Sequence, residues 1–421
     1  MEIKRFLGIR NTTSPERLKV GEMQAGTNVD TDNTGRLLSR DGTTLVVDAA
    51  GAHSLYANHV LAVMAVGTSL RMRRSATVWD EIATLTTSDP ISYETVLDTV
   101  YFSNGTDKGR IVRGEVREWG ITPPVSQPQA TATTGSLPPG NYMYALTFVR
   151  SDGHESGTGL AGSIDLPNGG GIAFSDIEIS TNPEINGKIV YISGSNGEVL
   201  FKALELPNTQ PQATYSGSGL DMAIPLITQF AGPPPAGSIV RSYNGLMYVA
   251  TGNVVYYSEP YAMELFHRDT DYLQFTAPVA MFEGVNDGVY VATVDSPGDE
   301  QESSAGTWFL SGPGPGKFQS VKMFDYGAIP GSSVLTQAAF FETQPQAEAE
   351  GQQGRPAVIW VTRHGVVLAR DGGNIQNLTE AVYSFPSAAS AAGMVRQHRG
   401  YVNYVVTLQG VGSANNKYVG G

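Results

Sequence analysis

The chain has 421 residues with 27 Lys or Arg and 40 Asp or Glu, a formal net charge of −13, and no cysteine. The missing cysteines exclude disulfides, thiolate metal sites and a cysteine nucleophile. With 49 glycines, 24 prolines and 16% charged residues, the composition disfavours a helix bundle, a disordered chain and a surface that grips nucleic acid. It predicts a folded, β-rich protein of two or three domains.

The charge is spread unevenly along the chain. Residues 1–120 are nearly neutral at −1, whereas residues 121–235 and 236–421 each carry −6. The first part contains the basic cluster Arg71, Arg73 and Arg74. We favour a solvated strand end there over a contact surface for an acidic neighbour.

No segment predicts membrane anchoring. Residues Met1 to Arg10 are charged and lack the apolar stretch of a secretory signal. The longest aliphatic run, Val60–Val66, has seven residues, whereas a membrane-spanning helix needs about 20. We therefore expect a soluble protein.

Residues 1–42 are expected to form an N-terminal arm with a strand–turn–strand. A weak candidate calcium loop lies within it, with possible ligands at loop positions 1, 3, 5 and 12: Asp30, Asp32, Thr34 and Asp41. Neither flank has a helical pattern, and Arg36 and Arg40 bring positive charge into the loop. A plain hairpin turn therefore competes with the calcium loop and is favoured.

From residue 43 onward, short β-branched and aromatic runs recur in pairs around polar turns. The pairs are Val60–Val66 with Thr68–Met72, Leu97–Phe102 with Arg110–Arg113, Leu246–Ala250 with Val254–Tyr257, Val289–Thr293 with Thr307–Leu310, and Val358–Thr362 with Val366–Ala369. Tyr401–Leu408 repeats the first half of a pair. Several of these pairs are separated by the roughly 40–50 residues of a propeller blade. The pattern predicts an all-β fold with a β-propeller of six or seven blades, or an incomplete one, from residues 43–122 and 236–421.

Residues 123–235 interrupt this repeat. Proline-rich segments at 123–128 and 232–235 bound a region with its own strands. Gly140–Arg150 alternates Tyr142, Tyr144, Leu146 and Phe148, and Lys188–Ile192 pairs with Val199–Leu204. This spacing predicts an inserted β-sandwich resembling a fibronectin type III module.

Helix content should be minimal. The two helical candidates are a turn near Tyr261–Phe266 and the alanine-rich Ser387–Met394. Asp295–Ser304 and Glu342–Gly354 are expected to be exposed loops.

The residues give no catalytic or cofactor site. Prolines remove donors from the glycine-rich Gly312–Gly316, which therefore cannot cradle phosphate. His53 and His59 lie six residues apart, but ordinary packing is favoured over a metal site. The carboxylates Asp269 and Asp271, and those of Asp299, Glu300 and Glu302, are expected to be solvated. We expect no enzyme activity, no cofactor and, apart from the weak calcium loop, no metal.

The order of several motifs resembles virion structural proteins of tailed bacteriophages. The motifs are Phe6–Asn11, Ser14–Leu18, Thr27–Asp30, Gly35–Gly42, His53–Tyr56, Tyr101–Gly105, Trp119–Ile121, Gly327–Gly331 and Asn377–Thr379. The chain looks most like the propeller-bearing tail hub, nozzle or tail tube proteins of short-tailed phages. No motif carries over a residue of the channel constriction.

This resemblance implies a structural role in the virion. The expected protein is a homohexameric ring around the DNA ejection channel, assembled in the host cytoplasm, which binds neighbouring tail proteins and lets DNA pass without sequence-specific binding. The alternative is a glycan-binding or glycan-cleaving propeller of a tail fibre or spike. A cellular propeller scaffold is a third reading.

Overall fold

The computed structural model describes residues 5–32, 34–42, 44–217, 221–294, 304–341, 354–386, 388–398 and 401–410. Most of the two loops expected at 295–304 and 342–354 lies outside these residues. The described part contains 35 strands and four short 3-10 turns, at Pro15–Arg17, Pro315–Lys317, Ala338–Phe341 and Asp371–Gly373. Within it, no helix has the length and apolar character to cross a membrane.

The N-terminal arm consists of two small ribbons. The parallel pair is β1 (Gly8–Ile9) and β2 (Glu22–Met23), and the antiparallel pair is β3 (Val29–Thr31) and β4 (Leu37–Ser39).

Five antiparallel sheets follow one another along the chain, and a terminal hairpin comes last. The first sheet is β5 (Ala52–Ala57), β6 (Ala62–Val66), β7 (Ser69–Arg73) and β8 (Trp79–Thr84). The second is β9 (Ser92–Val96), β10 (Thr99–Ser103), β11 (Lys108–Val112) and β12 (Glu115–Arg117). The third is β21 (Ile239–Tyr243), β22 (Leu246–Thr251), β23 (Val254–Glu259) and β24 (Ala262–Phe266), with β25 (Tyr272–Gln274) also paired to β23.

The last two sheets have the same meander order. The fourth sheet is β26 (Val279–Val285), β27 (Gly288–Thr293), β28 (Thr307–Ser311) and β29 (Gln319–Phe324). The fifth is β30 (Val334–Gln337), β31 (Pro356–Thr362), β32 (Gly365–Arg370) and β33 (Asn374–Asn377). The terminal hairpin is β34 (Ser390–His398) and β35 (Tyr401–Gln409).

Local turn chemistry explains why these strands fold back on their neighbours. Between β21 and β22, Asn244 has a φ of 48° and Gly245 a φ of 78°. A two-residue hairpin with both central residues in the left-handed region matches the twist of the flanking strands, and Asn-Gly is its preferred sequence. The tight turn fixes the register in which Tyr243 faces Leu246.

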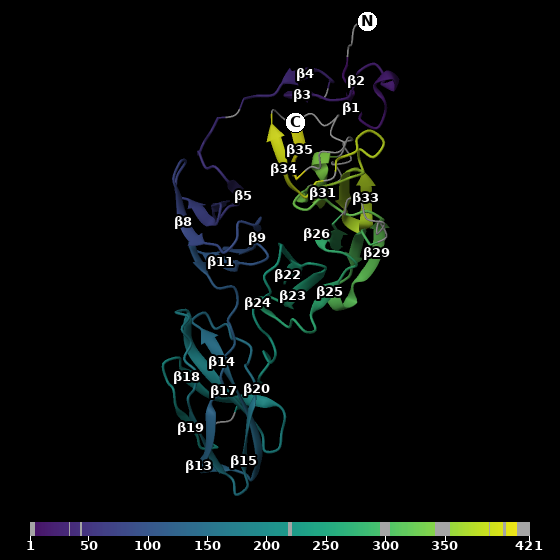
Figure 1. The fold of residues 1–421 in the computed structure, drawn as a ribbon. Helices are drawn as coiled ribbons and strands as arrows, with labels where there is room; N and C mark the ends of the chain where they lie inside the picture. Colours follow the sequence, from purple (N-terminus) through teal and green to yellow (C-terminus); the bar gives the residue numbers. More distant parts are fainter. Residues whose placement is uncertain are drawn as a thin grey trace.

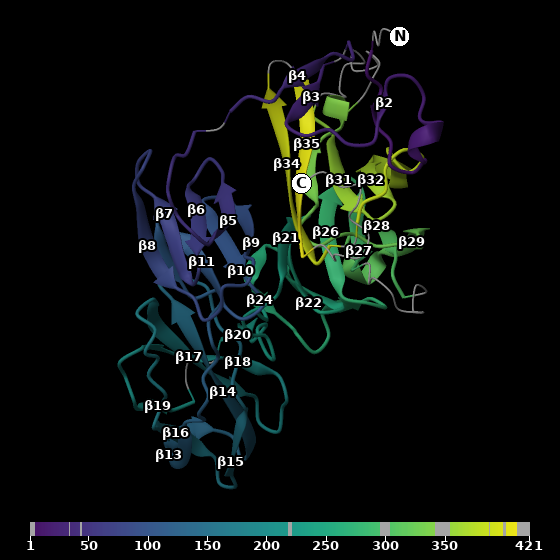
Figure 2. The ribbon, with the colours of Figure 1, turned by 45° about the horizontal axis from the view of Figure 1, so that its top comes forward.

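The sheets stack in chain order through hydrophobic clusters. One cluster joins each neighbouring pair from the first sheet to the terminal hairpin. Among the first strands, β21 contacts both β9 and β26, and β30 contacts β34. Figures 1 and 2 show the sheets fanned about a common centre, which is the arrangement of a β-propeller.

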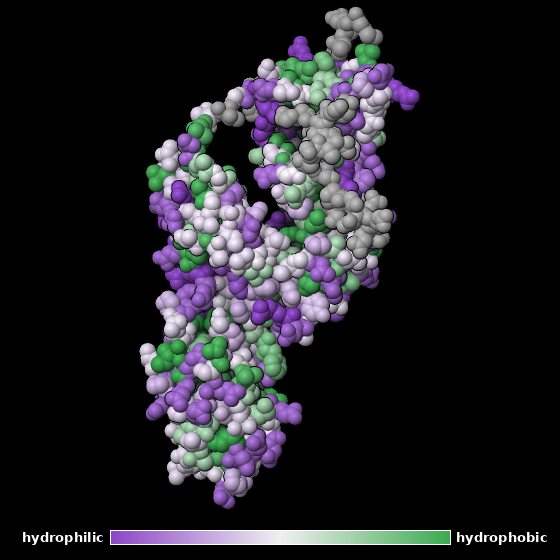
Figure 3. All heavy atoms as spheres, viewed as in Figure 1, coloured by the Kyte–Doolittle hydropathy of each residue, from purple (hydrophilic) through white to green (hydrophobic). Residues whose placement is uncertain are grey.

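The fan has an open side between the terminal hairpin and the first sheet. Among the described residues, no hydrophobic cluster joins these two elements. Figure 3 shows the molecule hollowed between the lobe that carries the first two sheets and the lobe that carries the later ones.

A separate two-layer unit interrupts the fan between β12 and β21. Its three-stranded sheet is β13 (Gln129–Leu137), β16 (Gly170–Ser175) and β19 (Ala213–Tyr215). Its five-stranded sheet is β15 (Gly162–Leu166), β14 (Gly140–Arg150), β17 (Ile185–Ser193), β18 (Leu200–Pro207) and β20 (Asp221–Pro225). The side chains of Tyr142, Tyr144 and Leu146 point into the core between the sheets. We call this unit the sandwich.

The paired runs predicted from the sequence are confirmed as neighbouring strands. Both helix candidates are wrong. Residues Ala262–Phe266 form β24, because Phe266 packs under Trp119 at a ring distance of 6.4 Å. Ser387 lies outside the described residues, and Ala388 and Ala389 precede the strand. Ala391 and Ala392 belong to β34, whose nine-residue pairing with β35 overrides their helix propensity.

Two buried tyrosines differ in whether their hydroxyl has a partner. The Tyr142 hydroxyl donates to the Pro138 carbonyl at 2.8 Å, whereas the buried Tyr248 hydroxyl has no partner among the described residues. We expect Tyr142→Phe to lower the free energy of unfolding by about 1 kcal/mol. Tyr248→Phe should be neutral or stabilising, since it removes a desolvated polar group. Urea denaturation of both variants measures this contrast, and equal losses would contradict it.

Candidate functional site: an ionic joint and an axial belt

Buried arginines and glutamates connect the sandwich to the second and third sheets. Glu184, just before β17 of the sandwich, accepts hydrogen bonds from Arg110 of β11 at 2.8 Å on both carboxylate oxygens. Arg117 of β12 reaches the same carboxylate at 3.0 Å. Two strands of the second sheet thus hold one acidic residue of the sandwich.

A second pair of residues connects the sandwich to the third sheet. Arg150, at the end of β14, donates to Glu264 of β24 at 2.6 and 3.2 Å, and Arg110 lies 3.5 Å from the same carboxylate. The Arg150 side chain is 3% exposed and that of Glu264 is 11% exposed. We call Arg110, Arg117, Arg150, Glu184 and Glu264 the ionic joint.

The joint keeps Arg150 charged. Burial alone would lower the pKa of Arg150, but its hydrogen bonds to Glu264 and Asp152 outweigh burial and raise the pKa above its ordinary value. Burial likewise opposes ionisation of Asp152, and the bond from Arg150 nevertheless lowers the pKa of that carboxyl. Removing one partner from such a network leaves a desolvated charge, which typically costs about 3–5 kcal/mol.

Close backbone packing reinforces the joint where the chain leaves and re-enters the sheets. The indole of Trp119 donates to the Met263 carbonyl at 2.9 Å. Gly120 has a φ of +83°, and a Cβ there would lie 2.7 Å from Pro233 and 2.8 Å from the Glu264 carbonyl oxygen. The incoming and outgoing connections therefore touch each other and the third sheet, which fixes the sandwich at both crossings.

A second polar network runs along the first strands of successive sheets. Arg241 of β21 donates to Glu283 of β26 at 2.9–3.0 Å, and the Ser333 hydroxyl donates to Glu283 at 2.8 Å. The Ser242 hydroxyl donates to Glu94 of β9. We call Glu94, Arg241, Ser242, Glu283 and Ser333 the axial belt, because near the centre of the fan it ties the second sheet to the third, the third to the fourth, and the fourth to the start of the fifth.

The axial belt contains one carboxyl that is poorly solvated. Burial raises the pKa of Glu94, against weaker opposing effects of the Ser242 hydroxyl and Arg241, and the nearby Glu283 adds to the rise. Arg241 is held in its charged form, since Glu283 outweighs the burial that would lower its pKa. Arg241 donates hydrogen bonds to Glu283, whereas Glu94 accepts one from the Ser242 hydroxyl, so Arg241 stabilises the charge of Glu283 more than that of Glu94.

The candidate calcium residues lie in or beside the β3–β4 hairpin. Asp30 pairs with Arg40 at 3.0 Å. Asp32 accepts bonds from the Thr34 hydroxyl at 2.6 Å and from the Thr34 and Arg36 amides at 2.9 Å, as in a turn closed by its own side chain. Asp41 follows β4. Among the described residues, no three His, Asp or Glu side chains gather in a way that could hold a metal.

Two of the other sequence candidates make ordinary local polar contacts. His53 contacts the Ser54 hydroxyl at 2.9 Å and the Gly67 carbonyl at 3.0 Å. Asp271 accepts a bond from the neighbouring Thr270 hydroxyl. The carboxylates of residues 299, 300 and 302 lie outside the described residues.

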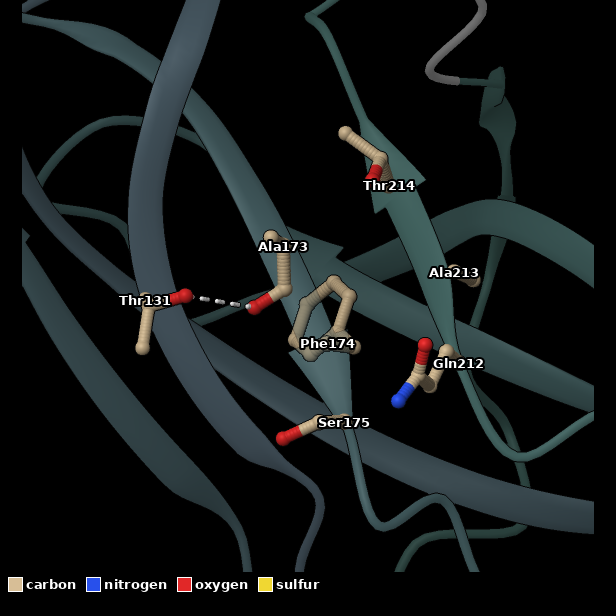
Figure 4. A pocket seen from close by; sticks show the side chains of 7 residues that line it. All are labelled: Thr131, Ala173, Phe174, Ser175, Gln212, Ala213 and Thr214. Carbon is tan, nitrogen blue, oxygen red and sulfur yellow. Dashed lines mark hydrogen bonds between the residues drawn. The ribbon is translucent and has the colours of Figure 1, made fainter.

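A shallow hollow of about 310 Å³ lies on the three-stranded sheet of the sandwich (Figure 4). Its lining is neutral: Thr131, Ala173, Phe174, Ser175, Gln212, Ala213 and Thr214. The Thr131 hydroxyl bonds the Ala173 carbonyl at 3.4 Å, as the dashed line in Figure 4 shows. Such a lining supplies hydrogen bonds but no charged group.

Neither the joint nor the belt was predicted from the sequence. Arg110 and Glu184 are 74 residues apart, and Glu94 and Ser242 are 148 apart. The signal that the sequence offered was a charged residue with apolar neighbours in a strand, as at Arg110 before Ile111 and Val112. That signal marks burial with a partner but does not identify the partner.

Breaking the joint should destabilise the protein far more than breaking a surface pair. We expect Arg150→Met to lower the free energy of unfolding by about 3 kcal/mol, because Glu264 loses its closest cation. The matched control Arg74→Met breaks an exposed pair with Asp80 and should cost about 1 kcal/mol or less. Guanidinium denaturation compares the two variants, and a similar small loss in both would show that the joint contributes little.

The raised pKa of Glu94 predicts a specific pH dependence. A carboxyl whose pKa is higher in the folded state binds its proton more tightly there than in the unfolded chain. Ionised Glu94 therefore lowers the free energy of unfolding at neutral pH, and this loss fades as the pH falls toward 4.5. Glu94→Gln should therefore gain stability over the wild type at pH 8 and lose that gain near pH 5. Denaturation across this range measures the difference. The control Glu198→Gln, on an exposed loop, should follow the wild type, and a Glu94→Gln curve parallel to the wild type would refute the assignment.

Comparisons with known proteins identify no family. No family model matches the chain, and no curated protein is similar to it. Among solved structures, the chain aligns with the Pan2 WD40 domain of Neurospora crassa at a TM-score of 0.33 and 12% identity, over 85% of this chain and 89% of that one. An alignment at this TM-score does not define a shared fold.

Proposed function

We propose that this protein is a non-enzymatic structural component of a bacteriophage tail. Copies of it would form a ring, as a hub, nozzle or tail tube layer, around the channel through which DNA leaves the virion. They would bind neighbouring tail proteins above and below. The motif order in the sequence suggests this role, and the ionic joint is the observation on the structure that supports it best.

The joint makes the sandwich and the propeller sheets one rigid block. A flexible tether between two domains needs few contacts, and rotation about it is the usual expectation. Here the buried ion pairs of Arg110 and Arg150 and the packed crossings oppose rotation. A subunit of fixed shape is what a closed ring requires, because the angle between neighbouring copies must be the same at every contact.

The surface of the sandwich suits a wall that does not retain DNA. Of its three basic residues, Arg150 and Lys188 are buried, and Lys202 pairs with Glu205 at 2.7 Å. Burial lowers the pKa of Lys188 to about 8, which weakens its charge further. Asp165, Asp176 and Glu198 are exposed. Acidic surface repels phosphate, so DNA would slide past it.

We also propose a domain assignment. We assign residues 123–235 as a fibronectin type III-like insertion and residues 1–42, 43–122 and 236–421 as the arm, the first blades and the remaining blades. The terminal hairpin would be the inner half of a sixth blade. Its nine-residue strands and its contact with β30 support this assignment.

The purified protein should form closed rings. Mass photometry is expected to show a discrete assembly, with six copies as the first expectation, and negative-stain images should show a central channel. Monomers alone at every concentration and salt tested would contradict the proposal. Selective signal on a glycan array would instead favour a tail fibre or spike protein.

A further inference from the structure

The N-terminal arm reaches across the molecule to the far end of the sequence. Asn11 makes three hydrogen bonds there. Its backbone N–H donates to the Val382 carbonyl at 3.0 Å. Its side-chain NH2 donates to the Ser384 carbonyl at 2.8 Å, and its side-chain oxygen accepts from the Ser384 backbone N–H at 2.8 Å. The side chain of Asn11 thereby satisfies both backbone groups of Ser384. This reciprocal pattern requires an asparagine-like amide at position 11.

Further polar contacts surround this pairing. Arg10 and Thr12 both donate to the Ala381 carbonyl at 3.0 Å, and Arg396 of β34 lies 3.5 Å from Asp30 of the arm. We call residues 381–384 with Arg396 the docking site. These contacts between the docking site and the arm are hydrogen bonds and an ion pair, so polar groups hold the arm in place.

The arm also leaves apolar side chains in water. No hydrophobic cluster of the described residues contains a residue before Tyr56. Five large apolar side chains of the arm and the following linker are exposed: Leu7, Val20, Leu38, Leu45 and Val46, the last two at 76% and 62%. Contact with another copy would remove these side chains from water.

The linker between the arm and the first sheet is long enough for the arm to bind more than one copy of the docking site. Residues 40–51, between β4 and β5, contain no strand in their described part, and Figure 1 shows this connection arching over the open side of the fan. Twelve residues span at most about 40 Å when extended. Every copy carries the same docking site, so a linker of this length can deliver an arm to its own copy or to an adjacent one.

We infer that in the assembled protein the arm binds the docking site of a second copy of this chain. The exchanged arm makes the same contacts through Asn11, Arg10 and Asp30, and the exposed apolar residues of the arm and linker are then covered between copies. Exchange of an identical element costs little, since no new recognition surface is needed. This inference rests on the proposed ring and names the contact that links its subunits.

The cysteine-free sequence allows a direct test. Thr12 and Ala381 are exposed and their atoms meet at 3.0 Å, so each can be changed to cysteine without disturbing a core. Chains carrying only Thr12→Cys are assembled together with chains carrying only Ala381→Cys and treated with a short bis-maleimide. Exchange predicts a covalent dimer in high yield, because the two thiols come from different chains.

Two controls define the background. Thr12→Cys chains mixed with Glu198→Cys chains report random collisions, since Glu198 lies exposed on the sandwich. A chain with both Thr12→Cys and Ala381→Cys should give covalent oligomers if arms are exchanged, and a cross-linked monomer if each arm stays on its own copy. Rings that yield only the cross-linked monomer would overturn the inference and leave the ring intact. Absence of any ring would contradict the proposed function itself, and the exchange with it.

The role of Asn11 has its own readout. Asn11→Ala removes both side-chain bonds to Ser384 and should weaken assembly about tenfold in concentration, measured by mass photometry. Asn11→Gln, with the same amide on a longer chain, should recover only part of this loss. Thermal unfolding should be nearly unchanged in both variants, because the arm belongs to no buried cluster. Unchanged assembly of Asn11→Ala would contradict the inference.

Discussion

The ionic joint is the constraint on which the shape of this protein depends. Two glutamates from different domains, Glu184 and Glu264, share the guanidinium groups of Arg110 and Arg150 in a region with little access to water. In such a place a charge is tolerated only with its partners at hydrogen-bonding distance. The network is therefore satisfied in one relative orientation of the sandwich and the sheets, whereas an apolar contact of similar size would tolerate sliding.

The rest of the molecule is built from repeated local pairings held together by a few long-range links. Hydrophobic clusters join each sheet to the next, and the axial belt adds charged contacts between the first strands of neighbouring sheets. The open side has no such cluster among the described residues, and the arm crosses near it to contact the last part of the chain. In such a stack each sheet packs mainly against its neighbours, as the repeats of a solenoid do. The two ends of the stack have a neighbour on one side and are therefore open to contact with other chains.

The sequence predicted the strands far better than the links between them. Hairpins such as β22–β23 could be predicted because two runs of β-branched and aromatic residues flank a Gly-Asn turn within one short stretch of sequence. The helix candidate at Tyr261–Phe266 was wrong because packing of Phe266 against Trp119 decides the conformation of this segment, and Trp119 follows another sheet. The joint could not be predicted, since the sequence around Arg110 or Glu264 contains no information about a partner that is many residues away. The calcium loop was a local pattern as well, and its side chains are engaged within the β3–β4 hairpin and with Arg40.

The ionic joint should make the sandwich and the propeller sheets move as one body. Pulsed electron spin resonance can measure this in the cysteine-free chain, with spin labels at Glu198→Cys on the sandwich and Asp325→Cys after β29, both exposed positions. A rigid joint predicts a single narrow distance distribution in the wild-type background, which broadens when Arg150→Met is added. A broad distribution already present with the joint intact would contradict it.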